Sequence, residues 1–194
     1  MFGSGQKRAA AKTGAKRAKL HSIAAMMRGR SFAGRFDVAG VTHGFTYSPA
    51  KATVTGNKLQ LTGDLVVVNL PPSRPRDVRA TLMAAQGGIG TAPLRKQLPS
   101  DTSTAHPDLP VVESTGSLSF CGVLYFKLAP LDGRALGVPA DMSQIQMNVR
   151  LAPVNDAERE LQGAFSSVVD ALYGKDVDGS AAEAAVSELN KLLA

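Results

Sequence analysis

The chain has 194 residues, of which 44% are hydrophobic and 20% charged, enough for one globular domain with a substantial core. No run approaches the roughly 18 to 20 apolar residues that span a bilayer, and the amino-terminal stretch lacks the apolar region of a secretory signal. The single cysteine, Cys121, excludes an internal disulfide and a thiolate metal cluster, and it fits a reducing compartment. We therefore expect a cytoplasmic protein without a transmembrane segment.

The net charge of +6 is unevenly distributed. No acidic residue precedes Asp37, and from Asp37 onward 13 basic residues face 16 acidic ones, a balance of −3. The basic residues before Asp37 are Lys7, Arg8, Lys12, Lys16, Arg17, Lys19, Arg28, Arg30 and Arg35. Such an asymmetry is typical of a tail that interacts with a partner.

Residues 1–19 contain little that could be buried, so the composition predicts disorder there. Leu20, Ile23, Ala24 and Met27 follow at the spacing of one helical face, which predicts a short docking helix, and glycines with interleaved arginines then predict a linker. We therefore expect a basic, largely disordered arm over residues 1–35 and a single globular domain over 36–194.

The β-rich part is predicted over residues 36–153. Along 36–47 the apolar alternation changes phase at Gly40, which predicts a β-bulge, and Ser48-Pro49 predicts a break. Gly56-Asn57 then predicts a two-residue hairpin loop between strands over 52–55 and 58–69.

Three further strands are predicted by alternation, over 78–85, 116–129 and 145–151. The stretch 116–129 is apolar on one face and partly apolar on the other, which favours a central strand. Residues 87–110 lose the pattern among Gly, Pro, Ser and Thr, and predict a loop of more than about 20 residues.

The carboxy-terminal segment, residues 154–194, changes to a helical period. A capping box formed by Asn155 and Glu158 opens the first predicted helix, and a second box formed by Ser180 and Glu183 opens another. Strands followed by helices indicate a mainly β (α+β) fold. We expect an antiparallel β-sandwich or barrel of six to eight strands with a helical hairpin.

The chemistry-bearing residues do not form a recognisable catalytic, cofactor or metal motif. The glycines of 87–91 lack the helix and the lysine of a phosphate loop, and a polar loop offers a triad no rigid scaffold. The other residues considered were Asp101, Ser103, His106, Asp108, His21, His43, Cys121, Asp176 and Asp178. We expect no enzyme, no cofactor and no metal site, and interpret His43 as a hydrogen-bonded, half-buried strand residue.

The sequence therefore predicts a non-catalytic binding or structural module. The nine basic residues before Asp37 are its candidate polyanion-binding residues, with nucleic acid as partner, and the domain is a possible homo-oligomer. An anionic membrane, an acidic protein surface, a targeting signal and a solvated terminus remain alternative readings of the arm. The alternative function is a carrier of a small, lipid-like apolar ligand in an internal cavity of the β domain.

Overall fold

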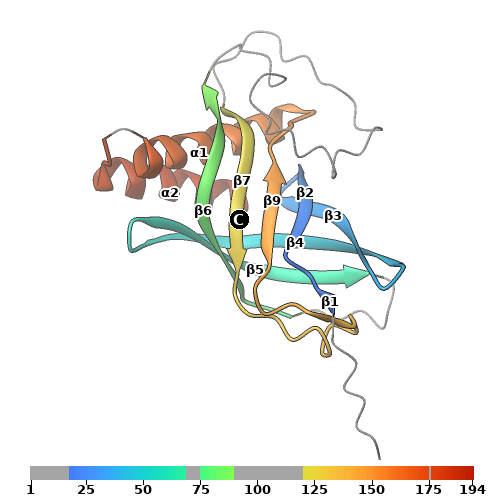
Figure 1. The fold of residues 1–194 in the computed structure, drawn as a ribbon. Coiled ribbons are helices and arrows are strands. Elements are labelled where there is room, and N and C mark those ends of the chain that lie inside the picture. Colours follow the sequence, from blue (N-terminus) through green and yellow to red (C-terminus); the bar gives the residue numbers. More distant parts are fainter. Residues whose placement is uncertain (1–17, 69–74, 90–119, 175) are drawn as a thin grey trace, which may run out of the picture.

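A computed structural model of the chain describes residues 18–68, 75–89, 120–174 and 176–194. These residues form a closed β-barrel of seven strands followed by two helices, which confirms the mainly β class and selects the barrel over the sandwich (Figure 1). The elements in chain order are β1 (Ala18–Lys19), β2 (Ser22–Arg28), β3 (Ser31–Val38), β4 (Val41–Thr55), β5 (Lys58–Val68), β6 (Val78–Ile89), β7 (Phe120–Leu128), β8 (Ala140–Asp141), β9 (Gln146–Arg150), α1 (Asp156–Tyr173) and α2 (Gly179–Leu193).

The barrel strands follow the order β2-β3-β4-β5-β6-β7-β9. All neighbours pair antiparallel except β2 and β9, whose parallel pairing closes the barrel. The short strands β1 and β8 form a separate parallel pair, with Ala18 beside Ala140 and Lys19 beside Asp141. Neither short strand was predicted, because two residues carry no detectable alternation.

The predicted helix over residues 20–27 is wrong, because this segment contains β2. Ile23, Ala25 and Met27 are buried while Ala24 and Arg28 are exposed, which is the alternation of a strand. Pairing with both β3 and β9 satisfies the backbone of this apolar segment. Residues 18–35, which the sequence assigned to the arm, thus form β1, β2 and most of β3.

The predicted bulge at Gly40 is also wrong. Ala39 and Gly40 have φ of 51° and 77° and form a two-residue loop, since Val38 pairs with Val41 across it. Such a loop needs two positive φ angles, and it shifts the phase of the apolar residues as a bulge would. The register shift lies instead between Pro49 and Lys51, so β4 continues through the predicted break.

The hairpin predicted at Gly56-Asn57 is confirmed. Thr55 pairs with Lys58, and the two loop residues have φ of 57° and 56°. The central strand is confirmed as β7, which pairs with β6 on one side and β9 on the other and buries Leu124, Phe126 and Leu128. Residues 90–110 of the predicted loop and residues 116–119 of the predicted strand lie outside the described residues.

Both predicted helices are confirmed, with one change of cap. The Glu158 N–H donates to the Asn155 side chain at 2.9 Å, as the first capping box requires. At α2 the cap is Asp178 and not Ser180: the carboxylate accepts from the Ser180 and Ala181 N–H groups at 3.0 Å each. The Ala181 N–H and the Ser180 side chain lower the pKa of the Asp178 carboxyl.

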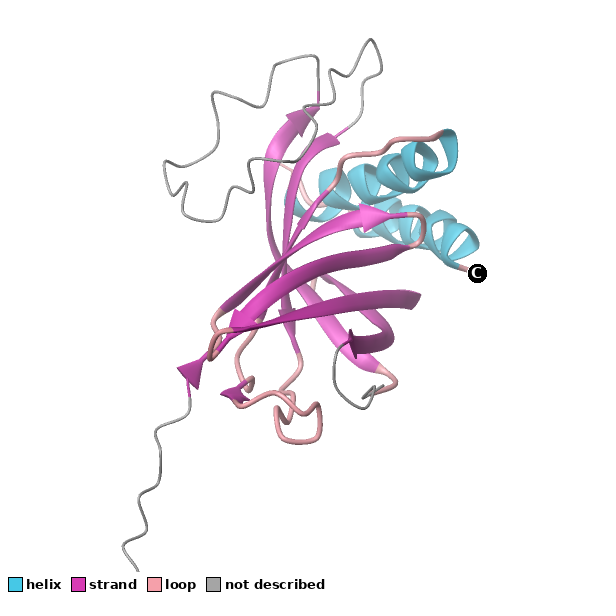
Figure 2. Cartoon of the chain, turned by 90° about the vertical axis from the view of Figure 1, so that its right-hand side faces the viewer, coloured by secondary structure: helices cyan, strands magenta, loops and turns pink. Residues whose placement is uncertain are grey.

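The helices cover the part of the barrel that strand pairing leaves open. β3 pairs with β4 only as far as Tyr47, and farther along β4 the Asn190 side chain of α2 bonds both backbone groups of Ala52, at 2.7 and 2.9 Å. Phe165 of α1 packs on Phe32, with ring centroids 5.8 Å apart. Figure 2 shows the two helices lying together on one side of the curved sheet.

Candidate functional site

The structure describes four of the nine predicted polyanion-binding residues, and these four lie at different places on the barrel. Lys7, Arg8, Lys12, Lys16 and Arg17 lie outside the described residues. Lys19 lies on β1 at one end of the barrel, whereas Arg28 and Arg30 flank the β2–β3 turn and Arg35 lies exposed on the outside of β3. The length of β2 separates the first position from the turn by about 20 Å, at about 3.3 Å per residue. Lys19, Arg28 and Arg30 therefore do not form one patch.

Two adjoining hollows lie at the end of the barrel that carries β1, and we call them together the arm-end trough. The smaller hollow, of about 330 Å³, is lined by Lys19, by residues 131–133 and by residues 140–142. The larger hollow, of about 550 Å³, is lined by residues 75–79 and 129–132, with Ala135 and Leu136. Leu131 and Asp132 line both hollows. Figure 1 places β1 at the lower end of the barrel, away from the helices.

Backbone hydrogen bonds hold the walls of the trough in place. The Leu65 N–H donates to the Pro75 carbonyl at 3.0 Å, and the Ala129 N–H donates to the Arg79 carbonyl at 2.8 Å. A Cβ at Gly133 would lie 2.3 Å from the Ala140 carbonyl oxygen, so the 131–142 segment packs this closely only with glycine there. The arginines of the larger hollow therefore stand on an ordered backbone.

The ion pairs that the structure gives between described residues, Arg159–Asp156 and Lys191–Glu188, lie on the helices and not in the trough. Arg76 and Arg79 thus make no ion pair within the described part of the chain. Asp132 accepts a hydrogen bond from the Arg134 N–H at 2.9 Å.

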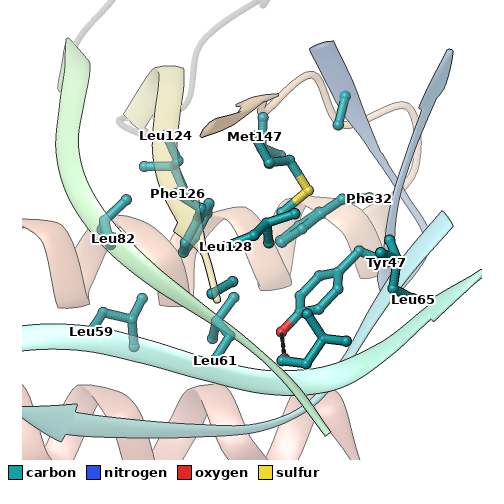
Figure 3. Close-up of a cluster of buried hydrophobic side chains, with 14 of the residues drawn as sticks. Phe32, Tyr47, Leu59, Leu61, Leu65, Leu82, Leu124, Phe126, Leu128 and Met147 are labelled. Atoms are coloured by element: carbon teal, nitrogen blue, oxygen red, sulfur yellow. Dashed lines mark hydrogen bonds between the residues drawn. The ribbon is translucent and has the colours of Figure 1, made fainter. Parts of the chain in front are cut away.

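The barrel interior is filled by side chains. Phe32, Tyr47 and Phe126 are fully buried, and Phe32 lies 6.2 Å from the ring of Tyr47 and 5.9 Å from that of Phe126 (Figure 3). The Tyr47 hydroxyl donates to the Val78 carbonyl at 2.9 Å, and burial followed by the nearby Asp64 charge raises the pKa of this tyrosine. These aromatic side chains pack against one another inside the barrel.

The prediction that His43 is a hydrogen-bonded, half-buried strand residue is wrong. Its side chain is 1% exposed and stacks on Phe36 with ring centroids 5.3 Å apart, while neither ring nitrogen has a hydrogen-bond partner. The register pairs His43 with Phe36 and directs the imidazole into the barrel. This residue is buried without satisfying its polar atoms.

The other candidate residues give no centre of reaction in the described structure. His21 is exposed beside β2, and Asp178 caps α2. Asp101, Ser103, His106 and Asp108, and the side chain of Cys121, lie outside the described residues. Within the described residues, no group of three His, Cys, Asp or Glu side chains could hold a metal ion. No described helix is both long and apolar enough to cross a membrane.

Comparisons with protein-family models, with curated proteins and with solved structures found no match for this chain. Its function is therefore inferred from the charge and geometry of its own residues. The sequence analysis did not single out Arg76 and Arg79, because no local pattern distinguishes them from other exposed basic residues. Only the fold brings them to the end of the barrel that carries Lys19.

Proposed function

We propose that this protein is a non-catalytic nucleic-acid-binding module that engages its partner through its basic amino-terminal end. One observation carries this proposal: charge is segregated along the molecule. Residues 1–17 contain five basic and no acidic residues, whereas residues 154–194 contain eight acidic and three basic ones. The basic segment joins the fold at β1, and α1 begins beside the β2–β3 turn at the other end of the barrel.

This segregation supports oriented binding of a polyanion. Lysines and arginines that contact phosphates release condensed counterions, which gives an affinity that is independent of sequence and falls with salt. The acidic helices repel the same polyanion, so an approaching strand is steered toward the basic end. The function needs no reactive group, only an ordered barrel that presents a basic segment.

The test measures fluorescence anisotropy of a labelled oligouridylate with the full chain across a salt titration. A variant in which Lys7, Arg8, Lys12, Lys16 and Arg17 are all changed to Gln should bind far more weakly. Its log–log salt slope should be shallower by up to about 3.5, since each lost phosphate contact on a single strand removes about 0.7.

A matched pair of variants separates the basic segment from overall charge. K12Q/K16Q and K51Q/K58Q each remove two positive charges, and Lys51 and Lys58 stand on the β4–β5 hairpin. Only the first pair should weaken binding markedly. The proposal would be overturned if the variant with five substitutions bound as tightly as the unmodified chain. Binding that does not respond to salt would also overturn it.

A further inference from the structure

We propose that the outer face of β7, β9, β2 and β3 is the folded part of the nucleic-acid site, where basic side chains bind phosphates and Tyr125 stacks on a base of a single strand. This inference rests on the proposed function and gives it a place on the described barrel. We call this surface the basic sheet face, and its residues are Arg28, Arg35, Tyr125, Lys127, Asn148 and Arg150. Figure 1 shows β7, β9 and β2 side by side.

Strand pairing brings Tyr125 and two cations together on the outside of the barrel. β7 and β9 bury alternate side chains in the core, and the side chains between these point outward. The register places Tyr125 opposite Asn148, and Arg150 lies two residues farther along β9. Arg150 is therefore a diagonal neighbour of the tyrosine, about 7 to 8 Å away. Lys127 follows Tyr125 on the same side of β7.

The row of side chains through Tyr125 continues across β2 to β3. Asn148 pairs with Ala24, and Ala24 pairs with Arg35. At about 4.8 Å between neighbouring strands, Arg35 lies about 14 Å from Tyr125. Ala24 is exposed and small, so no bulky side chain stands in its place in the row. The face therefore offers an aromatic ring with cations on several sides of it.

The charges of the face favour a polyanion as its occupant. The neighbouring strands β6, β7, β9 and β2 contain no acidic residue and four basic ones, which are Arg79, Lys127, Arg150 and Arg28. Asp37 lies at the edge of the face, two residues beyond Arg35, and accepts a hydrogen bond from the Thr42 hydroxyl at 2.5 Å. A guanidinium offers a planar set of N–H donors that matches the oxygens of a phosphate.

The aromatic ring of Tyr125 favours a single strand over a duplex. The ring is half-buried, and its hydroxyl donates to Gln86 Oε1 of β6 at 2.6 Å, which fixes its orientation. Beside it, the Gln146 amide donates to the Asn148 side chain at 2.8 Å. An unpaired base stacks on such a ring and bonds polar side chains with its edge. In a duplex the bases already stack on one another, and only phosphates would reach the face.

The test measures the affinity of full-chain variants for labelled oligouridylate across a salt titration. K127Q/R150Q should bind more weakly and lower the log–log salt slope by about 1.4, or about 0.7 for each phosphate contact. K51Q/K58Q removes the same charge on the β4–β5 hairpin and should bind as the unmodified chain does. Tyr125→Ala should weaken binding roughly 5- to 150-fold, as loss of one base stack does. Tyr125→Phe keeps the ring and should lose less affinity than the alanine variant.

Tyrosine fluorescence tests the stack independently of affinity. The chain has three tyrosines and no tryptophan, so tyrosine is its intrinsic fluorophore. Tyr47 is fully buried, and the Tyr173 hydroxyl is bonded to the Leu82 carbonyl at 2.6 Å. Saturating oligouridylate should therefore quench the emission of the unmodified chain and leave that of Tyr125→Phe unchanged. Equal quenching in the two chains overturns the assignment of the stack to Tyr125.

The outcomes also separate the basic sheet face from the proposed function. If neutralising residues 1–17 abolishes binding while folded K127Q/R150Q and Tyr125→Ala variants bind unchanged, the function stands and the assignment of the face is wrong. If the unmodified chain does not bind oligouridylate at low salt, both are wrong. Equal competition by a duplex of the same length overturns the preference for a single strand. Weaker binding by K127Q/R150Q, with K51Q/K58Q unaffected, supports the face.

Discussion

Among the described residues, His43 buries its imidazole ring without a hydrogen-bond partner for either nitrogen. An imidazole buried without a partner costs about 1 to 3 kcal/mol of desolvation, which an apolar ring of similar shape avoids. His43→Phe should therefore raise the free energy of unfolding by roughly 1 kcal/mol while keeping the stack on Phe36. Chemical denaturation measures the change.

The exposed His21 supplies the control for this prediction. His21→Phe should change the stability by no more than about 0.5 kcal/mol, because surface substitutions away from special features have small effects. A clear loss of stability in His43→Phe would show that the imidazole has a partner in solution.

Glycine at position 63 is required by the bulge in β4. A Cβ there would lie 2.2 Å from the Ser48 carbonyl oxygen and 2.7 Å from the Pro49 Cα, so backbone must move. Gly63→Ala should cost roughly 1 to 3 kcal/mol or more, as overpacking does. A thermal melt compares this variant with the unmodified chain.

Gly44 on the same strand pair provides the matched substitution. A Cβ at Gly44 meets Val68 side-chain atoms at 3.7 Å, an ordinary contact. Gly44→Ala should be neutral or stabilise by up to about 1 kcal/mol, since alanine restricts the unfolded chain. If both variants melt alike, steric exclusion at position 63 is not what selects glycine there.

At the scale of elements, one buried carboxylate couples α1 to the barrel. Glu158 is 3% exposed, and its two oxygens accept from the Gly29 N–H at 2.7 Å and the Val154 N–H at 2.8 Å. In a simple capping box this side chain would return to the N-cap residue itself. Here it bonds the residue before the cap and the β2–β3 turn, 129 positions away.

Loss of this carboxylate should loosen the turn. Glu158→Ala leaves two N–H groups without their charged acceptor and should cost about 1.5 to 3 kcal/mol. Hydrogen exchange should show a higher exchange rate for the Gly29 backbone N–H in this variant. Glu160→Ala, two residues along on the exposed face, should leave both the stability and the Gly29 amide unchanged. Similar effects of the two substitutions would contradict the coupling.

The sequence predicts elements well where one period is unambiguous. Leu124, Phe126 and Leu128 alternate with more polar residues, and Asn155 stands before a long helical stripe, so β7 and α1 are visible locally. Around residues 20–27 nearly every position is apolar or small, and both the helical and the strand period fit. Partners more than 100 residues away in β9 decide the outcome there.

At the scale of the whole molecule, the position of β2 in the barrel changes what a truncation means. Removing residues 1–17 leaves every described element intact, so the remaining chain should fold with an unchanged circular dichroism spectrum. Removing residues 1–35 deletes β2 and most of β3, opens the barrel and should abolish cooperative unfolding.

These two truncations give distinct readouts. Loss of nucleic-acid binding in the shorter chain, residues 36–194, would report unfolding and not the loss of basic residues. A folded, cooperative 36–194 fragment would contradict the closed barrel.

The candidate site could be predicted from the sequence only in part. The excess of basic residues before Asp37 is visible in the chain alone, and it identifies the arm. The trough is assembled from four separate segments, residues 19, 75–79, 129–136 and 140–142, and no local pattern relates them. Barrel closure brings them together, and closure depends on pairings that span most of the chain.

The closing pair of the barrel has a consequence for the polarity of the protein. Each antiparallel neighbour reverses the chain, so seven strands deliver it to the pole opposite the one at which it entered. An even number of strands would return it to the entry pole. The odd count therefore places β1, where the described chain enters, and the start of α1 at opposite poles of the barrel.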